Sequence, residues 1–346
     1  MVRRSRVFVG AVAAAALLGG CTVPFTKAQA VRPRPTPSPS AQATRTLPTD
    51  PSPSTSPATC RIAVAGNQPG SGGFVTVPGG DFTPDSKSDV KLPNADPNGY
   101  GNGALGLSFD FAAGKWLPVR RTYVAPNGLS YAYGSFDADG GFYVIDATSG
   151  KVREIAKGST FLIVEWRDAG IYAMRNDPLP SGARIFHGLY LVNPDTGQVR
   201  QLTSRGNWSV IGPLAAWGYD YADQNQPDTS HTLLRYDLVS GGVVSYFTAA
   251  GSSPTVIGFD EQDRPIVNSI NDVAQQISIM LGVNQAYQIS SGPGYQSTQT
   301  MNFNGQAVSD GRGMWIGTNH GLMLYTTAYG FTKVSDTTGQ VAGRCH

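Results

Sequence analysis

Residues 141–152, GFYVIDATSGKV, decide the fold because the same pattern returns along the chain. Residues 188–199 are GLYLVNPDTGQV, residues 233–244 are LLRYDLVSGGVV, and a shorter copy runs from 321 to 330. Each copy is a short apolar run, a polar turn that closes on glycine and a second run, which is typical of a β-hairpin. The closing glycines are at positions 150, 197, 241 and 330, in steps of 47, 44 and 89 residues. Steps of about 45 residues, doubled in the last interval, predict the four-stranded blades of a β-propeller.

A second repeated element precedes the hairpins. Residues 124–133, VAPNGLSYAY, resemble the S-P-D-G turn of TolB-like propeller repeats, with Ala125 and Asn127 in place of Ser and Asp. Residues 166–172 and 259–267 occupy the same place in later repeats. Residues 310–322, DGRGMWIGTNHGL, resemble the repeat of two-component regulator propellers over about one blade. Both resemblances imply a propeller scaffold.

The repeats predict an all-β domain over residues 60–346, with strands running from the axis of each blade to its rim. Six blades fit best, and seven are the alternative. No segment keeps apolar residues at helical spacing over several turns, so we expect almost no helix in this domain. The predicted blades cover residues 60–119, 120–156, 157–203, 204–248, 249–290 and 291–334.

The first 21 residues have the pattern of an export signal. Arginines at positions 3, 4 and 6 precede an uncharged apolar stretch over residues 7–18, which is too short to span a bilayer. The following residues, Leu18, Gly19, Gly20 and Cys21, resemble the lipobox of bacterial lipoproteins. This resemblance implies a lipid on Cys21 and an extracytoplasmic protein anchored to the membrane. The alternative is cleavage after Ala30, at the end of an A-x-A site, which would release a secreted protein.

Residues 22–59 are dominated by Pro, Ser, Thr and Ala, and such a composition buries too little apolar surface to order the chain. We therefore predict a disordered linker before the propeller. From residue 60 onward there are 19 Lys plus Arg and 23 Asp plus Glu, a formal net charge of 19 − 23 = −4. A weakly acidic domain with dispersed charges argues against nucleic-acid binding.

Once Cys21 is assigned to the lipid, Cys60 and Cys345 remain near the two ends of the propeller. In an exported protein two remaining cysteines favour a disulfide, although two buried thiols or bonds to cysteines of other chains are the alternatives. The first and last strands of a ring are neighbours, so a bond between these residues would close it.

Two long polar loops, each followed by a histidine, are the predicted ligand-binding region, because loops of this length on a rigid scaffold often hold binding residues. Three histidines share one position in their repeats. A structural role for this repeated histidine is favoured over a metal collar, since zinc ligands must converge on one ion. We predict neither a metal nor a cofactor. The candidate ligand-binding residues are Arg175, Asp177, Arg184, His187, Asp220, Asp223, Asp228, His231 and His320.

The sequence holds no nucleophile elbow, zinc-protease motif or phosphate-binding loop, so no catalytic residue is predicted. The leading hypothesis is a monomeric, membrane-anchored propeller lipoprotein that serves as a binding or scaffold module for a protein or glycan partner. The alternative is an extracellular enzyme that hydrolyses a carbohydrate or a lactone at the loop face of the propeller.

Overall fold

The structure is a computed structural model in which the chain divides into two units, Met1–Thr55 and Ser56–His346, and only the second contains described residues. The described residues all belong to the second unit: 59–66, 70–93, 106–135, 141–157, 161–178, 184–220, 231–248, 253–270, 275–289 and 301–346. The predicted signal peptide, the lipidation site Cys21 and nearly all of the predicted linker lie outside them.

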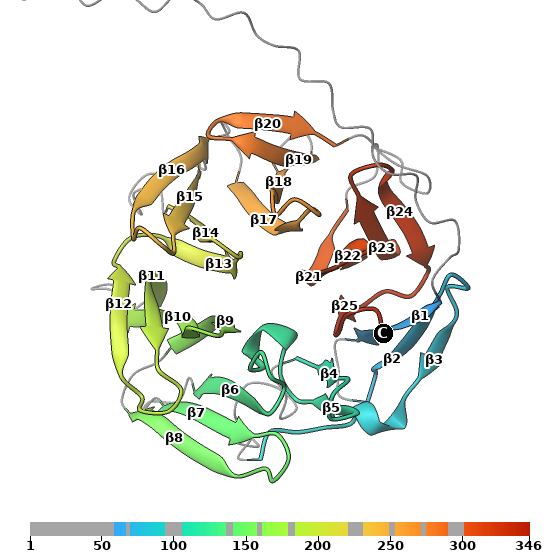
Figure 1. Ribbon diagram of the computed structural model, residues 1–346, viewed down its shortest axis with the longest axis horizontal. Coiled ribbons are helices and arrows are strands. Elements are labelled where there is room, and N and C mark those ends of the chain that lie inside the picture. The colour runs from blue at the N-terminus through green and yellow to red at the C-terminus, as the bar shows by residue number, and fades with distance from the viewer. Residues whose placement is uncertain are drawn as a thin grey trace, which may run out of the picture. The chain divides into compact units, whose positions relative to one another are not determined.

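Five four-stranded sheets, one three-stranded sheet and one two-stranded sheet surround a central axis (Figure 1), which confirms the predicted all-β propeller. We count the six larger sheets as its blades. Blade 1 contains β1 (Cys60–Ala65), β2 (Gly73–Val77), β3 (Phe82–Pro84) and β25 (Gln340–Val341). Blade 2 contains β6 (Ser130–Ser135), β7 (Gly141–Asp146) and β8 (Val152–Lys157). Blade 3 contains β9 (Phe161–Arg167), β10 (Gly170–Pro178), β11 (Arg184–Val192) and β12 (Val199–Thr203).

The other three blades each have four strands. Blade 4 contains β13 (Asn207–Ile211), β14 (Ala215–Tyr219), β15 (Thr232–Asp237) and β16 (Val243–Thr248). Blade 5 contains β17 (Ser253–Phe259), β18 (Pro265–Ile270), β19 (Gln275–Gly282) and β20 (Gln285–Gln288). Blade 6 contains β21 (Phe303–Asp310), β22 (Gly313–Thr318), β23 (Gly321–Thr326) and β24 (Gly330–Ser335).

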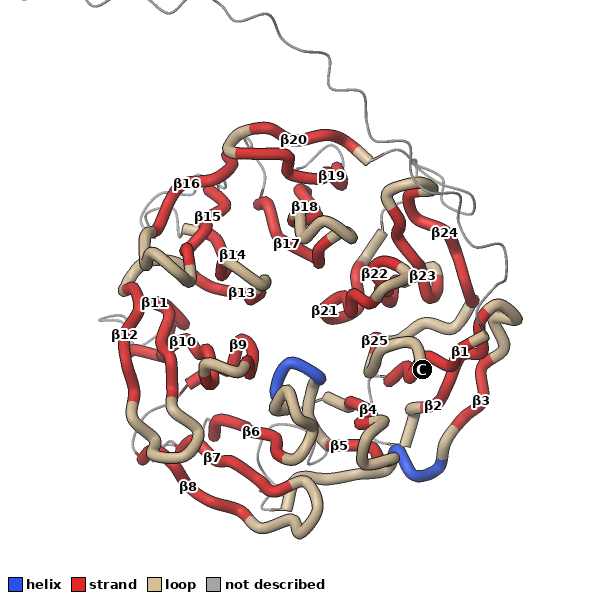
Figure 2. Tube along the Cα trace, in the orientation of Figure 1, coloured by secondary structure: helices blue, strands red, loops and turns tan. Residues whose placement is uncertain are grey.

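The strand order within blades 2 to 6 follows the order of the chain, so each repeat in the sequence corresponds to consecutive strands of one blade. In blades 3 to 6 the strands are paired in chain order, and the first strand of each blade lies nearest the axis (Figure 2). Helix in the described segments is confined to two short 3₁₀ turns, η1 (Ser86–Ser88) and η2 (Arg121–Tyr123). A search of the described residues for a helix long and apolar enough to cross a membrane found none.

The repeated hairpin turn is held by one polar side chain and one glycine. The Asp146 carboxylate accepts hydrogen bonds from the backbone N–H groups of Thr148 and Ser149 at 3.0 and 2.7 Å. Asn193 and Asp237 accept the equivalent pairs of bonds in blades 3 and 4. The closing glycines have φ values of 71°, 72° and 80°, in the left-handed region that suits glycine. The sequence D/N-x-x-x-G therefore forms a β-hairpin turn that ends in a left-handed glycine, and this turn is repeated in blades 2, 3 and 4.

The ring closes at blade 1. Strand β25, from near the C-terminus of the chain, pairs with β1 through Val64↔Val341 and supplies the inner strand of that blade. The predicted Cys60–Cys345 disulfide is present, with a Cα–Cα separation of 5.5 Å. The short hairpin of β4 (Ser108–Asp110) and β5 (Lys115–Leu117) lies between blades 1 and 2, and this sheet has two strands in the described chain. It is joined to the closing segment by the Phe109 N–H, which donates to Ala342 O at 2.9 Å.

Apolar side chains fill the spaces between and within the blades. All five tryptophans are buried, with exposed fractions between 0% and 9%, and Trp208 and Trp315 are among the largest fully buried side chains. Successive clusters join neighbouring blades, for example Trp208 of blade 4 with Met174 and Leu189 of blade 3. This packing holds the inner strands in fixed positions around the axis, where the candidate site lies.

Candidate functional site

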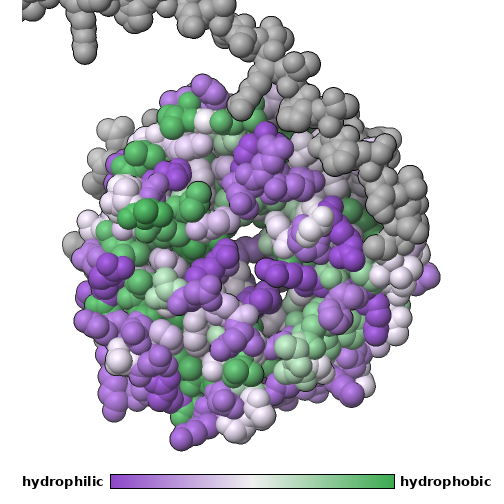
Figure 3. Space-filling model, in the orientation of Figure 1, coloured by the Kyte–Doolittle hydropathy of each residue, from purple (hydrophilic) through white to green (hydrophobic). Residues whose placement is uncertain are grey.

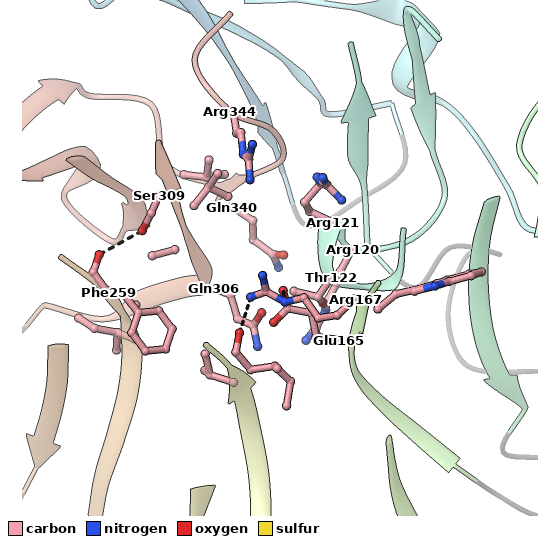
Figure 4. Close-up of a pocket in the computed structure, with 18 of the residues that line it drawn as sticks. Arg120, Arg121, Thr122, Glu165, Arg167, Phe259, Gln306, Ser309, Gln340 and Arg344 are labelled. Carbon is pink, nitrogen blue, oxygen red and sulfur yellow. Dashed lines mark hydrogen bonds and ion pairs between the residues drawn. The ribbon is translucent and has the colours of Figure 1, made fainter. Parts of the chain in front are cut away.

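A cavity of about 410 Å³ occupies the axis of the propeller (Figure 4), and every blade contributes to its wall. Most of the wall comes from the ends of the inner strands and the turns that follow them. Figure 3 shows an opening at the centre of the ring with hydrophilic residues around it. The polar and charged residues that line the cavity are Arg120, Arg121, Thr122, Glu165, Arg167, Asp263, Gln306, Ser309, Gln340 and Arg344.

Positive charge dominates the cavity wall. Arg120 and Arg121 enter from η2 and the residue before it, Arg167 ends β9, and Arg344 follows β25. The described lining thus contains four arginines and two acidic residues, whereas the whole region from residue 60 onward has a net charge of −4. The fold concentrates cations at the axis of an acidic domain.

Glu165 and Arg167 form an ion pair at the cavity wall. Arg167 Nε lies 2.7 Å from Glu165 Oε1, and the side chains are 41% and 16% exposed respectively. Arg167 Nη2 also donates a hydrogen bond to the Ile211 carbonyl of blade 4. Burial raises the pKa of Glu165 to about 7 although Arg167 and the Ile211 N–H oppose that rise. The pair therefore holds a carboxyl group that titrates near neutrality.

Arg121 and Arg344 are arranged differently. Within the described chain, neither guanidinium makes an ion pair or a side-chain hydrogen bond with another residue. Burial, and after it the positive charge of Arg344, lowers the pKa of Arg121. Asp110 and Glu165 partly offset this effect. In the part of the chain that the structure describes, both guanidinium groups therefore line the cavity with N–H donors that no other residue accepts.

Asp110 provides the nearest negative charge outside the axial cavity. It lines a separate cavity of about 270 Å³ that shares Arg121 and Arg344 with the axial one. Its Oδ1 accepts the backbone N–H groups of Ala112 and Ala113 at 2.9 and 3.4 Å, while its Oδ2 is buried without a hydrogen bond in the described structure. One oxygen of the Asp110 carboxylate is thus used by its own turn, and no ion pair joins Asp110 to Arg121 or Arg344 in the described structure.

A third cavity, of about 370 Å³, continues the axial site toward the opposite face. It shares Val210, Ile257 and Gln306 with the axial cavity, and β21 runs between the two. Among the described residues that line it, none has a charged side chain. The polar residues that line this amide-rich cavity are Ser209, Thr255, Asn268, Asn302 and Gln306.

The residues predicted from the polar loops lie elsewhere. In the backbone register of the two strands, Arg175 of β10 lies opposite His187 of β11. Asp177 and Arg184 lie at the far end of the same hairpin. The β10–β11 connection is at the end of the sheet opposite the β9–β10 turn that bears Arg167, because antiparallel strands alternate in direction. Asp223 and Asp228 lie outside the described residues. Binding at these loops stays a prediction.

Asp220, His231 and His320 are described, and each has local contacts. Asp220 accepts from Arg205 Nε at 2.9 Å. The His231 ring lies edge-on to Tyr219 with 5.2 Å between ring centroids, and the His320 N–H donates to Thr318 Oγ1 at 3.0 Å. None of the three lines the axial or the amide-rich cavity. The described residues contain no group of three or more His, Cys, Asp or Glu that could hold a metal ion.

No protein-family model matches the chain, and no curated protein matches it. Several solved structures do match the chain. TolB from Acinetobacter baumannii is 15% identical over 79% of this chain and 62% of its own, with a TM-score of 0.40. A puromycin-hydrolyzing peptidase from Mycobacterium tuberculosis is 13% identical over 79% of this chain and 45% of its own, with a TM-score of 0.45.

A third solved structure is similar over nearly its whole length. A putative 6-phosphogluconolactonase from Bacteroides fragilis is 12% identical over 85% of this chain and 98% of its own, with a TM-score of 0.44. By contrast, this chain spans less than two thirds of the TolB chain and under half of the peptidase chain.

The axial arginines were missed in the sequence because they do not repeat. Arg121 precedes the first turn of blade 2, Arg167 ends the strand before the corresponding turn of blade 3, and Arg344 follows the closing strand. The one available signal was the adjacent pair Arg120 and Arg121 in a region that is otherwise poor in charge. The sequence provides no spacing rule that would have joined this pair to Arg344, which is more than 220 residues later.

Proposed function

We propose that this protein is an extracytoplasmic propeller that serves as a binding module for a protein or glycan partner, with the axial cavity as its binding site. The observation that supports this most directly is the pair Arg121 and Arg344, whose guanidiniums face the cavity without a partner in the described chain. A concave site with a few convergent polar groups on a rigid scaffold is typical of ligand recognition.

The test is copurification from native membranes after crosslinking. The wild-type chain is compared with the double variant Arg121→Gln, Arg344→Gln and with Arg153→Gln, which alters an exposed arginine on the outer strand β8. We expect one partner to be enriched with the wild type and with Arg153→Gln and to be lost from the double variant. Equal recovery with all three proteins would contradict a site at the axis.

We further propose that the module is a lipoprotein anchored through Cys21, with residues 22–59 as a linker between the membrane and the propeller. The Pro-rich composition of the linker supports this role, because such segments remain extended. We expect Cys21→Ser to move the protein from the membrane fraction to the soluble fraction and to make its processing insensitive to globomycin. Membrane retention of this variant would favour another anchor, and soluble wild-type protein would favour the secreted alternative.

A hydrolytic enzyme is the second candidate, and Glu165 is the observation that favours it. A carboxyl group whose pKa is about 7 is suited to general acid–base catalysis near neutral pH. Glycoside hydrolysis usually needs two carboxyl groups, and Asp263 is the other acidic residue at the described cavity wall. Turnover of aryl glycosides or of a sugar lactone that is lost in Glu165→Gln would support this candidate, and its absence in the wild type would count against it.

A further inference from the structure

We propose that the axial channel binds an acidic saccharide, with its carboxylate or phosphate group at Arg121 and Arg344 and its hydroxyl groups in the amide-rich cavity. This inference rests on the proposed binding function and names the chemistry of its ligand. Carboxylate and phosphate share the oxygen geometry that guanidinium groups recognise through paired N–H donors.

The anion end follows from how the four arginines are used. Arg167 is already paired with Glu165 and bonded to the Ile211 carbonyl, so its charge is largely satisfied within the protein. Arg121 and Arg344 have no such partner in the described residues, and Arg120 adds a third cation at the same wall. Like charges that are partly removed from water destabilise one another, as the lowered pKa of Arg121 also indicates. An oxyanion between these groups would relieve that repulsion.

The neutral end follows from the wall of the amide-rich cavity. Asn268 is only 9% exposed, and its Oδ1 accepts from Gln275 Nε2 at 2.8 Å. Gln275 is itself fixed by two bonds to the Met301 backbone, at 2.7 and 2.6 Å, so the amide orientation of Asn268 is set, and no described residue accepts from its N–H₂ group. Amide and hydroxyl groups both donate and accept hydrogen bonds, as sugar hydroxyls do. The absence of charge from this described wall disfavours a second ionic group on the ligand.

The two cavities are adjacent, because Val210, Ile257 and Gln306 line both, and each is large enough for a small ligand. Gln306 lines both cavities and is positioned by its Nε2, which donates to Ser209 O at 2.5 Å. Volumes of about 410 and 370 Å³ each fall within the range of small-molecule sites. The channel therefore changes from cationic to neutral along its length, which matches a molecule with one anionic group and a hydroxyl-rich remainder.

The experiment is calorimetric titration of the full-length protein at low ionic strength with four probes: D-glucuronate, glucose 6-phosphate, glucose and inorganic phosphate. We expect at least one acidic sugar to bind about tenfold or more tightly than both glucose and inorganic phosphate. Stronger binding of glucuronate would assign the anion to a carboxylate, and stronger binding of glucose 6-phosphate would assign it to a phosphate. No binding of either acidic sugar, or binding of glucose or inorganic phosphate equal to that of the tighter acidic sugar, would overturn the proposal.

Three variants locate the site. Arg344→Gln should weaken binding of the acidic sugar about tenfold or more and leave binding of glucose unchanged, and Arg344→Lys should restore part of the loss. Arg153→Gln, on the outer strand β8, is the matched control and should bind as the wild type does. Unchanged affinity in Arg344→Gln would overturn the assignment of the anion end. Copurification of a partner that persists although no acidic sugar binds would leave the binding function standing and reject only this ligand.

Discussion

At the scale of single residues, Gly197 shows how one missing Cβ atom sets the distance between two blades. A Cβ atom built on Gly197 would overlap the carbonyl oxygen of Ile155, on β8 of the neighbouring blade. Gly150 closes the equivalent turn with nearly the same φ, 71° against 72°, yet a Cβ atom there would meet nothing within 4 Å. A side chain at Gly150 would therefore cost only the strain of a left-handed backbone, whereas a side chain at Gly197 would add a steric clash with the neighbouring blade.

This pair yields a prediction about stability. Gly150→Ala should lower the free energy of unfolding by about 1–2 kcal/mol, the cost of a left-handed non-glycine residue. Gly197→Ala should lower it by roughly a further 1–3 kcal/mol, because blade 2 must move away from the turn. Urea unfolding followed by tryptophan fluorescence measures both values. Equal losses in the two variants would show that the contact with Ile155 is not a constraint.

At the scale of elements, ring closure depends on a strand of only two residues. β25 makes two register pairs with β1, Val64↔Val341 and Ala65↔Gln340, and the Cys60–Cys345 disulfide lies beside them. The bond spans 285 residues of sequence, so it restricts the unfolded chain strongly. The covalent bond thus supplements a short inner strand.

We expect the double variant Cys60→Ser, Cys345→Ser to lose up to about 5 kcal/mol of unfolding free energy, an upper value from loop-closure entropy. Urea unfolding with and without a reductant measures this loss. The reductant should destabilise the wild type and leave the double variant unchanged, which controls for effects on other parts of the chain. Wild-type and variant curves that coincide would mean that pairing of β25 is sufficient to close the ring.

The elements themselves were largely predictable from the sequence. The D/N-x-x-x-G turns fix hairpins locally through Asp146, Asn193 and Asp237, so their periodicity located the blades without tertiary information. Blade 5 was harder to recognise because Asn284, with φ of 55°, occupies the left-handed position between β19 and β20. The sequence did not predict the inner strand β25, because two residues are too short to show the repeated pattern. This strand is defined by its pairing with β1.

At the scale of the whole molecule, the candidate site is a product of ring closure and was not predictable from local sequence. Arg121, Arg167 and Arg344 come from three different blades, and only the common axis brings them to one cavity. The sequence predicted binding at loops that lie at the other end of the sheets, because the length and polarity of a loop can be recognised in the sequence. Convergence on an axis is not visible there, since each contributing residue occupies a different place in its repeat.

Glu165 couples this axis to the stability of the entire ring. Its pKa is raised from 4.5 to about 7 in the folded protein because the carboxyl group is buried between blades 3 and 4. The folded state therefore binds more protons than the unfolded chain between these pH values, so the contribution of Glu165 to stability is greatest below pH 4.5 and is lost as pH rises through 7. The shift corresponds to at most about 3 kcal/mol, with Glu165 16% exposed.

Glu165→Gln should remove this pH dependence and leave the protein more stable than the wild type at pH 8, since no charge then has to be buried. Unfolding free energies at pH 5 and pH 8 measure the effect. Glu154→Gln, on the outer strand β8, is the matched control and should retain the wild-type slope. If Glu165→Gln were instead less stable than the wild type at pH 8, the ion pair with Arg167 would contribute more than burial of the carboxylate costs, and the ring would be held together at its axis by that pair.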